Sequence, residues 1–241
     1  MNDIFPTNSA LIALSGGVDS AVLLAKAKEA GLDIHAATVI SEFTPIAEIK
    51  AAEELAARFN VPWHPIYLGM LVFEDIRKNP PERCYLCKKI IMQEIKALAD
   101  SLGLSAVLDG THADDAADRP GIRALKELGI LSPFADAGIG KTEILGEAQR
   151  LGVAAAPPSA CLATRIPFGT VLTEELLETV DAAENILREG VKGILRVRLD
   201  KTQATVETEP EERQTAKLYE QKLKQLGITE VFYKDYTSGG V

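Results

Sequence analysis

Cysteines, aromatic residues and long apolar runs are scarce in this 241-residue sequence, which has 3 cysteines and 5% aromatic residues. An odd number of cysteines cannot all pair within one chain, so a disulfide framework is not what holds the fold together. No run approaches the ~18 apolar residues that a membrane-spanning helix requires, and the N-terminus lacks a basic segment followed by an apolar one. We therefore expect a cytoplasmic protein that does not associate with membranes.

Basic residues are outnumbered by acidic ones, with 26 Lys and Arg against 35 Asp and Glu, and the formal net charge is -9. Such a charge repels long polyanions, which disfavours a general nucleic-acid-binding protein but leaves room for a local basic pocket. The apolar share of 46% is ordinary for globular proteins, and the length allows one large domain or a larger and a smaller one.

Short apolar strands alternate with helical patterns through the first part of the chain. The expected strands are residues 10–14, 34–40, 62–68 and 106–108, and the expected helices follow residue 20 and span 46–59 and 84–102. This alternation predicts an α/β fold with a doubly wound parallel sheet, in a domain of residues 1–168. In such a sheet ligands bind beyond the carboxyl ends of the strands.

The pattern changes after Gly169, where we expect a smaller α+β domain of residues 169–241 for substrate binding or oligomerisation. Its expected elements are a helix at 173–189, strands at 194–200 and 204–208, a helix at 211–226, and a strand at 230–233. Residues 236–241 read as a loose tail.

A glycine-containing loop follows the first strand and reads Ser15-Gly16-Gly17-Val18-Asp19-Ser20. Glycines let a backbone approach a ligand closely, and a helix that starts here would present unpaired N–H groups to a phosphate. Asp19 beside an anion site suggests a bridging Mg²⁺. The alternative is a tight turn in which the glycines serve packing and Ser20 caps the helix. The strand-loop-helix context favours phosphate, although no Lys-Ser or Lys-Thr pair closes a Walker motif.

The hexapeptide resembles the pyrophosphate loop (PP-loop) of the N-type ATP pyrophosphatases. Members of that family activate a carbonyl or carboxylate group by adenylation and release pyrophosphate, so the resemblance implies ATP use and AMP transfer. It also implies that Ser41, after the second strand, lies near adenine and that Gly110, after the fourth, contacts the nucleotide. Both positions agree with the general location of ligands in open parallel sheets.

The three cysteines form a CxxC pair, Cys84 and Cys87, and a distant third residue, Cys161. If Pro80-Pro81 marks a helix start, the pair shares one helical face near the positive end of the helix, which favours thiolates. Spacing alone leaves four interpretations open: unligated cysteines, a redox pair, a zinc site with His112 as fourth ligand, or an iron-sulfur cluster with three thiolates. The last requires all three thiols to converge.

A narrower resemblance rests on several motifs taken together. They are residues 15–20, Asp109-Gly110-Thr111, Arg119-Pro120-Gly121-Ile122-Arg123, Ser132-Pro133 with Lys141-Thr142-Glu143, and Ala160-Cys161-Leu162-Ala163-Thr164-Arg165-Ile166-Pro167-Phe168-Gly169. Over nearly the whole chain these resemble the LarE family of ATP-dependent sulfur transferases, which make the thiocarboxylates of the nickel-pincer nucleotide cofactor.

This resemblance assigns roles to the cysteines. In one form of the family a single cysteine, matching Cys161, gives up its own sulfur. The sequence departs from that form at Cys84 and Cys87 and is similar to a three-cysteine branch, in which a 4Fe-4S cluster carries an extra sulfide on its open iron. The resemblance therefore implies Cys84, Cys87 and Cys161 as cluster ligands, with Cys161 as a sulfur donor in the alternative.

Two arginines two residues apart, Arg196 and Arg198, share one face of an expected strand. From the residues alone, an exposed basic edge strand that discourages aggregation is the more usual explanation. The resemblance favours an anion pocket, because both match residues that bind substrate phosphate or carboxylate. By the same resemblance Lys88 and Glu184 match active-site positions. Arg165 is expected either to hold an anion near Cys161 or to order its loop.

The resemblance implies an oligomer that uses ATP, Mg²⁺ and a source of sulfide to convert a pyridinium mononucleotide carboxylate into a thiocarboxylate. Asp114 and Asp115 are candidates for a second magnesium contact or for helix caps. One alternative is a tRNA thiolase, disfavoured by the acidic charge and by the lack of an added RNA-binding domain. Another is a nucleotide- and metal-binding protein without catalytic activity.

Overall fold

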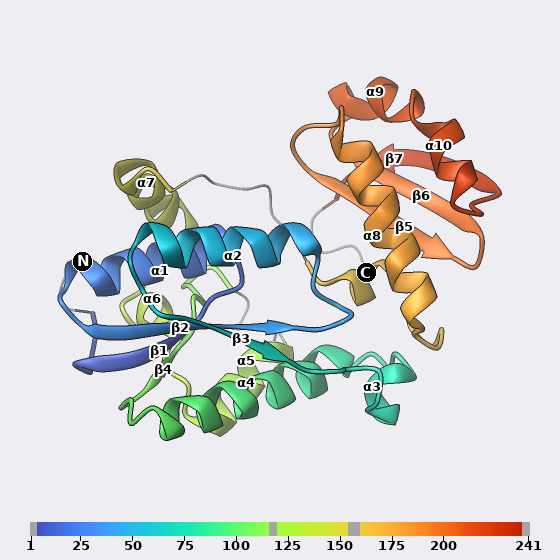
Figure 1. Cartoon of the computed structure of the whole chain (residues 1–241). Coiled ribbons are helices and arrows are strands. Elements are labelled where there is room, and N and C mark those ends of the chain that lie inside the picture. Colours follow the sequence, from blue (N-terminus) through green and yellow to red (C-terminus); the bar gives the residue numbers. More distant parts are fainter. Residues whose placement is uncertain (1–3, 116–119, 154–159, 238–241) are drawn as a thin grey trace. The chain divides into compact units, whose positions relative to one another are not determined.

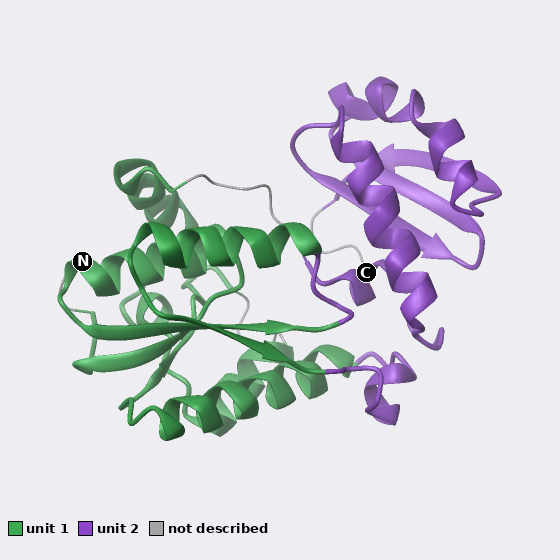
Figure 2. Cartoon of the chain, viewed as in Figure 1, with its two compact units in different colours: residues 1–41, 46–68, 82–156 green, residues 42–45, 69–81, 157–241 purple. Residues whose placement is uncertain are grey.

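The computed structural model describes residues 4–115, 120–153 and 160–237, which form two compact units (Figure 2). Unit 1 contains residues 1–41, 46–68 and 82–156, and unit 2 contains residues 42–45, 69–81 and 157–241. Unit 2 therefore gathers three segments that precede residue 169. The boundary expected between residues 168 and 169 stays a prediction.

Unit 1 is built on a parallel four-stranded sheet in the order β3-β2-β1-β4. The strands are β1 Ser9–Ala13, β2 Asp33–Ile40, β3 Trp63–Tyr67 and β4 Val107–Leu108. The helices of this unit are α1 Val18–Glu29, α2 Ile46–Arg58, α4 Arg83–Ser101, α5 Pro120–Leu128, α6 Pro133–Asp136 and α7 Lys141–Leu151. This is the predicted α/β architecture, and its elements fall within a few residues of their expected positions.

Helices cover both faces of the sheet, with α1, α2 and α7 on one side and α4 and α5 on the other (Figure 1). Alternate side chains of β1 divide between the two layers: Ile12 packs with α1 and α2, and Leu11 packs with α4. Both are fully buried. A central strand that is apolar on both faces is what a doubly wound sheet requires.

Unit 2 contains a three-stranded sheet in the order β5-β6-β7, antiparallel between β5 and β6 and parallel between β6 and β7. The strands are β5 Leu195–Asp200, β6 Gln203–Thr208 and β7 Glu230–Asp235. Helix α8, Glu174–Arg188, lies across this sheet (Figure 1), and its buried side chains are Leu177, Val180, Ala183 and Leu187. Thr173 caps the helix, its hydroxyl accepting the Leu176 N–H at 3.3 Å.

The helix expected at 211–226 is broken into three pieces: a 3₁₀ turn at Pro210–Glu212, α9 Arg213–Lys217 and α10 Glu220–Gln225. The break occurs because the Leu218 and Tyr219 N–H groups bond to carbonyls three residues back instead of four. Strand β7 runs two residues further than expected. The ladder continues to Tyr236, whose N–H donates to the Thr208 carbonyl at 2.9 Å, so the expected tail starts later; residues 238–241 lie outside the described part.

Two early segments belong to unit 2. Residues 69–81, which include α3 Glu74–Arg77, run beside residues 166–172. The buried Asn79 joins them: its side-chain amide donates to the Pro167 carbonyl at 2.8 Å, and its own carbonyl accepts the Gly169 N–H at 2.9 Å. Asn79 has a φ of 55°, a left-handed conformation that asparagine tolerates better than most residues.

Across the part of the chain that the structure describes, each helix is too short or too polar to cross a membrane. The cytoplasmic location stays a prediction.

Candidate active site

The loop at residues 15–20 joins β1 to α1. Gly16 has a φ of 78°, and a Cβ there would lie 2.4 Å from the Glu48 carbonyl oxygen, so this position admits only glycine. Ser20 does not cap the helix: its hydroxyl donates to the Gly17 carbonyl at 3.1 Å. Among the residues that the structure describes, no side chain caps α1 at Gly17 with a hydrogen bond. The first N–H groups of α1 thus face the loop with the positive end of the helix dipole, as an anion site requires.

Gly110 packs against this loop from the end of β4. A Cβ at Gly110 would lie 2.9 Å from the Ser20 backbone nitrogen, so a side chain there would push the two segments apart. The predicted nucleotide-contacting residue is therefore placed directly beside the first turn of α1. Ser41, the other predicted nucleotide contact, directly follows β2 in the same unit.

Asp19, the predicted magnesium ligand, forms an ion pair with Lys141 at the start of α7. The Lys141 ammonium lies 2.5 Å from Asp19 Oδ1, and its backbone N–H donates to Asp114 Oδ2 at 2.6 Å. The two paired side chains keep 35% and 31% of their surface exposed. Lys141 belongs to one of the motifs of the resemblance, but the sequence predicts no role for it. The sequence signal that could have pointed to Lys141 is its position directly after Gly140, at the start of a helix.

Lys88, the predicted active-site lysine, is held by Asp109. Its ammonium lies 2.9 Å from Asp109 Oδ2, while Asp109 Oδ1 accepts the Thr111 N–H at 2.9 Å and the Thr111 hydroxyl. Burial alone would raise the pKa of Asp109, but the charge of Lys88 and the bonds from Thr111 outweigh it and lower that pKa. The charged carboxylate of Asp109 therefore holds the ammonium group of Lys88, the residue that follows Cys87 in the sequence.

These contacts join the helix of the CxxC pair to the phosphate loop. Lys88 follows Cys87 on α4, Asp109 holds Lys88, and Gly110, the next residue, abuts Ser20. A movement of α4 would therefore be transmitted to the phosphate loop through these contacts. The connection runs through one ion pair and one close backbone contact within unit 1.

Cys84 and Cys87 lie in the first turns of α4, three residues apart on one face, and both are half-buried. Cys84 Sγ lies 3.6 Å from a guanidinium nitrogen of the buried Arg83. The helix starts at Arg83, one residue before the expected start at residue 84. The first turn thus supplies two thiols at the positive end of a 19-residue helix.

Tyr85, between the two cysteines, ties α4 to α5. Its hydroxyl donates to Glu127 at 2.7 Å, Lys89 donates to the same hydroxyl at 3.1 Å, and the Arg123 guanidinium lies 3.5 Å from the ring centroid. Arg123 belongs to the motif at residues 119–123, so that motif has a structural use here; Arg119 lies outside the described residues.

Cys161 lies in unit 2, immediately before a 3₁₀ turn at Leu162–Arg165. Arg165 is 1% exposed, and its guanidinium donates to the carbonyls of Ala160 at 2.8 Å and Cys161 at 3.3 Å. It also forms an ion pair with Glu184, with Nε 2.8 Å from Oε1. These contacts favour the interpretation that Arg165 orders the loop around Cys161.

Glu184 has two partners in the same unit. Besides Arg165, its Oε1 accepts the Val197 N–H at 2.9 Å, on the outer edge of β5. Glu184 therefore joins α8, the Cys161 turn and the arginine-bearing strand. These contacts give Glu184 a structural role, because they join the three elements. Its predicted catalytic role stays a prediction.

Arg196 and Arg198 project from β5 on the face opposite Leu195, Val197 and Leu199, which are at most 3% exposed. Arg198 Nε donates to Glu207 at 2.8 Å, and its Nη1 donates to the Thr164 carbonyl at 3.1 Å. Burial lowers the pKa of Arg196, and the nearby charge of Arg165 lowers it further.

The predicted site residues thus divide between the units. Unit 1 holds the phosphate loop, Lys88, Cys84 and Cys87, and unit 2 holds Cys161, Arg165, Glu184, Arg196 and Arg198. Among the described residues, no three or more His, Cys, Asp or Glu side chains form a group able to hold a metal ion. The convergence of the three thiols stays a prediction.

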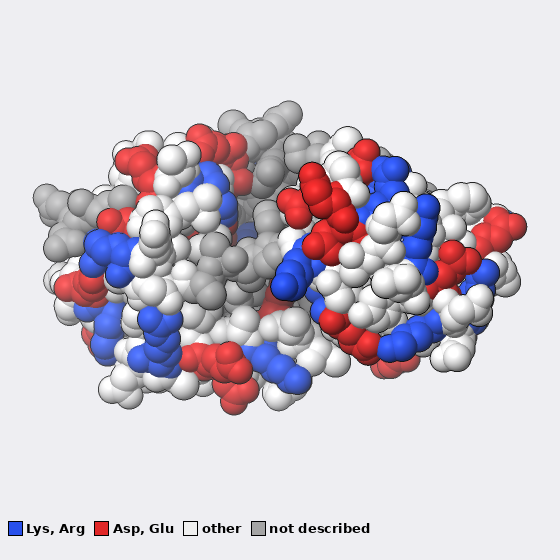
Figure 3. All heavy atoms as spheres, turned by 90° about the horizontal axis from the view of Figure 1, so that it is seen from above, with Lys and Arg blue, Asp and Glu red and all other residues white. Residues whose placement is uncertain are grey.

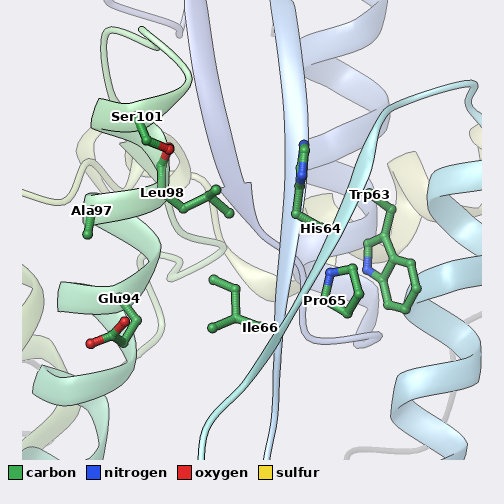
Figure 4. A pocket seen from close by; sticks show the side chains of 8 residues that line it. All are labelled: Trp63, His64, Pro65, Ile66, Glu94, Ala97, Leu98 and Ser101. Atoms are coloured by element: carbon green, nitrogen blue, oxygen red, sulfur yellow. The ribbon is translucent and has the colours of Figure 1, made fainter.

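A groove of about 490 Å³ lies elsewhere in unit 1, between β3 and α4 (Figure 4). Its lining includes His64 and Glu94 but none of the predicted site residues. His64 stacks on His35 with ring centroids 5.1 Å apart and a nitrogen-to-nitrogen distance of 2.8 Å. Burial and the neighbouring His35 lower the pKa of His64, which favours the neutral form of the His64 ring and a structural role for it.

The parallel sheet, its uncapped helix and the glycine loop between β1 and α1 define an N-type ATP pyrophosphatase, an ATP-using enzyme class. The Asparagine synthase family matches residues 9–93, from β1 into α4. A solved structure of NMN synthetase from Francisella tularensis is 19% identical, with a TM-score of 0.47, and the match covers 64% of this chain and 67% of that one.

Two relatives are more similar in sequence. An uncharacterized protein of Methanocaldococcus jannaschii is 36% identical over 213 residues, covering 87% of this chain and 81% of that protein. The pyridinium-3,5-bisthiocarboxylic acid mononucleotide synthase of Lactiplantibacillus plantarum is 33% identical over 207 residues, covering 84% of this chain and 75% of that protein. The chain belongs to the family of that synthase, the LarE family of ATP-dependent sulfur transferases.

Proposed function

We propose that the chain adenylates a carboxylate of a pyridinium mononucleotide and replaces one carboxylate oxygen with sulfur, in the synthesis of a nickel-pincer nucleotide cofactor. The carboxylate oxygen attacks the α-phosphorus of ATP and pyrophosphate leaves. Sulfur then attacks the acyl carbon, and AMP leaves with the original carboxylate oxygen. The observation that carries this proposal is the uncapped phosphate loop, joined through Gly110, Asp109 and Lys88 to the CxxC helix. We expect this chemistry in the cytoplasm.

The residues of unit 1 bind and orient ATP. The N–H groups at the start of α1 donate hydrogen bonds to the leaving pyrophosphate, and Lys141 adds a positive charge beside them. Asp19 fits a Mg²⁺ site because magnesium in nucleotide sites is commonly held by one or two carboxylates together with phosphates. Binding of the metal by Asp19 would release Lys141 toward the phosphates.

The arginines of unit 2 bind the mononucleotide. Arg198 keeps 24% of its side chain exposed and offers a planar guanidinium group to phosphate or carboxylate, while Glu207 and the Thr164 carbonyl hold it in place. Arg196 is 6% exposed and adds a second, more buried positive charge on the same face. A basic site made by two arginines suits a small anion better than a long polyanion. The face of the molecule in Figure 3 shows acidic and basic side chains interspersed, without a broad basic field among the described residues.

The donor set fits an iron-sulfur cluster in one respect: Cys84 and Cys87 present two thiols on one turn of α4. Cys161 would be the third ligand. A 4Fe-4S cluster held by three thiolates supplies an open iron to which sulfide binds. Arg165 holds the backbone of the third ligand, and Asp109 holds Lys88 beside the first two.

The test is pyrophosphate release by the anaerobically purified protein with ATP, sulfide and a carboxylated pyridinium mononucleotide. We expect release only when the mononucleotide is present, with a thiocarboxylate as product. Pyrophosphate release without dependence on the mononucleotide contradicts the proposal. The tRNA thiolase alternative instead requires tRNA binding that weakens steeply with salt, measured by a gel-shift assay.

The cluster has its own test. Iron and acid-labile sulfide should accompany the purified chain, and Cys84→Ala or Cys87→Ala should abolish repeated turnover. A single turnover with loss of one cysteine sulfur, unaffected by either substitution, assigns the donor sulfur to Cys161 and overturns the cluster.

A further inference from the structure

The face of the unit 2 sheet that carries the two arginines extends across all three strands. Residues paired in register on neighbouring strands project to the same face. The pairing therefore defines successive rows: Arg196, Glu207 and Lys234; then Arg198, Thr205 and Phe232; then Asp200, Gln203 and Glu230. The opposite face packs under α8. The substrate arginines are thus one edge of a larger surface.

Tyr236 extends this face at its cationic end. It follows Lys234 by two residues, and its N–H continues the ladder to the Thr208 carbonyl. The Arg196 guanidinium lies 5.7 Å from the Tyr236 ring centroid, which confirms that the two side chains share the face. Strand β7 therefore adds a column of Phe232, Lys234 and Tyr236 opposite the arginines.

The charges on the face are graded. The first two rows carry three cations, Arg196, Arg198 and Lys234, against the single carboxylate of Glu207, and the third row carries Asp200 and Glu230. Glu207 is 2% exposed, and its Oε1 accepts both Arg198 Nε at 2.8 Å and Lys234 Nζ at 2.9 Å. One end of the face thus attracts anions, and the other attracts a cation.

Phe232 lies between these two ends and is 52% exposed. Its row lies between the row of Asp200 and Glu230 and the row of Arg196 and Lys234, and an exposed aromatic ring at such a position can bind a planar cation. Strands β5 and β7 are two strand spacings apart, about 10 Å. A ligand that used both strands would need an anionic group and a separate planar ring, which inorganic phosphate does not have.

We propose that Phe232 is a specificity-determining residue that binds the pyridinium ring of the substrate, while Lys234 contacts a ring carboxylate and Arg196 and Arg198 hold the phosphate. The identity of the ligand rests on the proposed function. The ring is cationic and planar, and its substituents are anionic, so it matches the graded face. Lys234 keeps 56% of its side chain exposed and can turn from Glu207 to a ligand.

The test is the affinity of the full chain for nicotinic acid mononucleotide and for ribose 5-phosphate, which shares the phosphate but lacks the ring. Phe232→Leu keeps the apolar bulk and should weaken nicotinic acid mononucleotide binding by about 3- to 20-fold while changing ribose 5-phosphate binding less than about twofold. Phe232→Tyr should restore it. Leu218→Ala, at an 81% exposed apolar residue of the same unit, is the matched control and should change neither affinity.

Lys234→Met tests the carboxylate contact. The wild-type chain should prefer nicotinic acid mononucleotide over nicotinamide mononucleotide, which carries an amide instead, and the substitution should remove that preference. Retention of the preference overturns the role of Lys234.

Equal losses for both phosphates in Phe232→Leu, or no loss for either, overturn the role of Phe232. A change of oligomeric state in that variant without a change in ring preference also overturns it and assigns the face to contact between copies. If ring preference responds as expected but no pyrophosphate is released with any carboxylated mononucleotide, the binding site stands and the proposed reaction fails. If pyrophosphate is released and ring preference is unmoved, only the role of Phe232 fails.

Discussion

The anion sites that we propose for the two units differ in kind. In unit 1 the proposed phosphate-binding groups are backbone N–H groups, and the sequence requirement falls on glycines, because a side chain at Gly16 or Gly110 would meet the neighbouring backbone. In unit 2 the groups are arginine side chains, whose positions depend on partners from other elements, such as Glu207 on β6 and Glu184 on α8. The residues of a backbone site lie in one short sequence motif, whereas the residues of a side-chain site come from several elements of the fold.

The largest effect should come from Gly16→Ala. The added Cβ meets the Glu48 carbonyl oxygen at 2.4 Å in a left-handed conformation, so the loop must move. We expect ATP-dependent pyrophosphate release to fall at least about 100-fold, as for other misplaced binding groups. Gly31→Ala is the matched control: its φ of 79° is nearly the same as that of Gly16, but nothing lies within 4 Å of the added atom.

Gly31→Ala should cost about 1 kcal/mol of folding free energy through backbone strain and leave the pyrophosphate assay unchanged. Equal loss of activity in the two variants would mean that strain alone, and not the close approach of α2, makes glycine necessary in the loop.

Arg165→Met should be the most destabilising change in unit 2. It leaves Glu184 without its buried partner, and breaking such a pair costs about 3–5 kcal/mol. Urea unfolding followed by far-ultraviolet circular dichroism measures the loss, and ATP binding by unit 1 serves as the internal control. A loss below about 1 kcal/mol, the usual value of a surface pair, contradicts the buried role.

Asp109→Asn should cost about 1–3 kcal/mol at neutral pH because the buried carboxylate loses its charge toward Lys88. The folded-state pKa of Asp109 is lowered. Its stabilisation is therefore complete above the unfolded pKa of about 4 and is lost as the pH falls through the folded value.

The difference in unfolding free energy between wild type and Asp109→Asn should thus shrink from pH 7 toward pH 3. Urea unfolding at both values measures it. A difference that stays constant over this interval would show that the pKa of Asp109 is not lowered by folding.

Lys141→Met should have the smallest effect on stability, at most about 1 kcal/mol, because both members of its pair with Asp19 are about one-third exposed. Its effect on binding should be larger: we expect the KM for ATP to rise about 5- to 20-fold through loss of a phosphate contact. Lys28→Met, on the same unit and bonded only to the Asn60 carbonyl in the described hydrogen bonds, is the control and should leave KM unchanged.

The contrast between a short backbone motif and side chains from distant elements also explains which features the sequence predicted. The order of strands and helices in unit 1 and the glycine loop follow from local periodicity and from glycine chemistry, both of which are readable within a few residues. The contacts of Lys141 with Asp19 and of Lys88 with Asp109 join residues 122 and 21 positions apart, so no local pattern contains them.

Unit 2 was less predictable for three physical reasons. Residues 42–45 and 69–81 pack with residues 157–241 through polar contacts such as those of Asn79, which hydrophobic periodicity does not report. The break near Leu218 replaces four-residue hydrogen bonds by three-residue ones in a stretch whose composition suits one continuous helix. The contact between Tyr236 and Arg196 could be located only once the parallel register of β7 with β6 was known.

The most direct measurement of the central claim is isotope transfer. A pyridinium mononucleotide with heavy oxygen in its carboxylate is incubated with the wild-type chain, ATP and sulfide, and the AMP is analysed by mass spectrometry. We predict one labelled oxygen in AMP for each thiocarboxylate formed, because the carboxylate oxygen attacks the α-phosphorus. A thiocarboxylate formed alongside unlabelled AMP, or alongside ADP and labelled phosphate, would contradict adenylation.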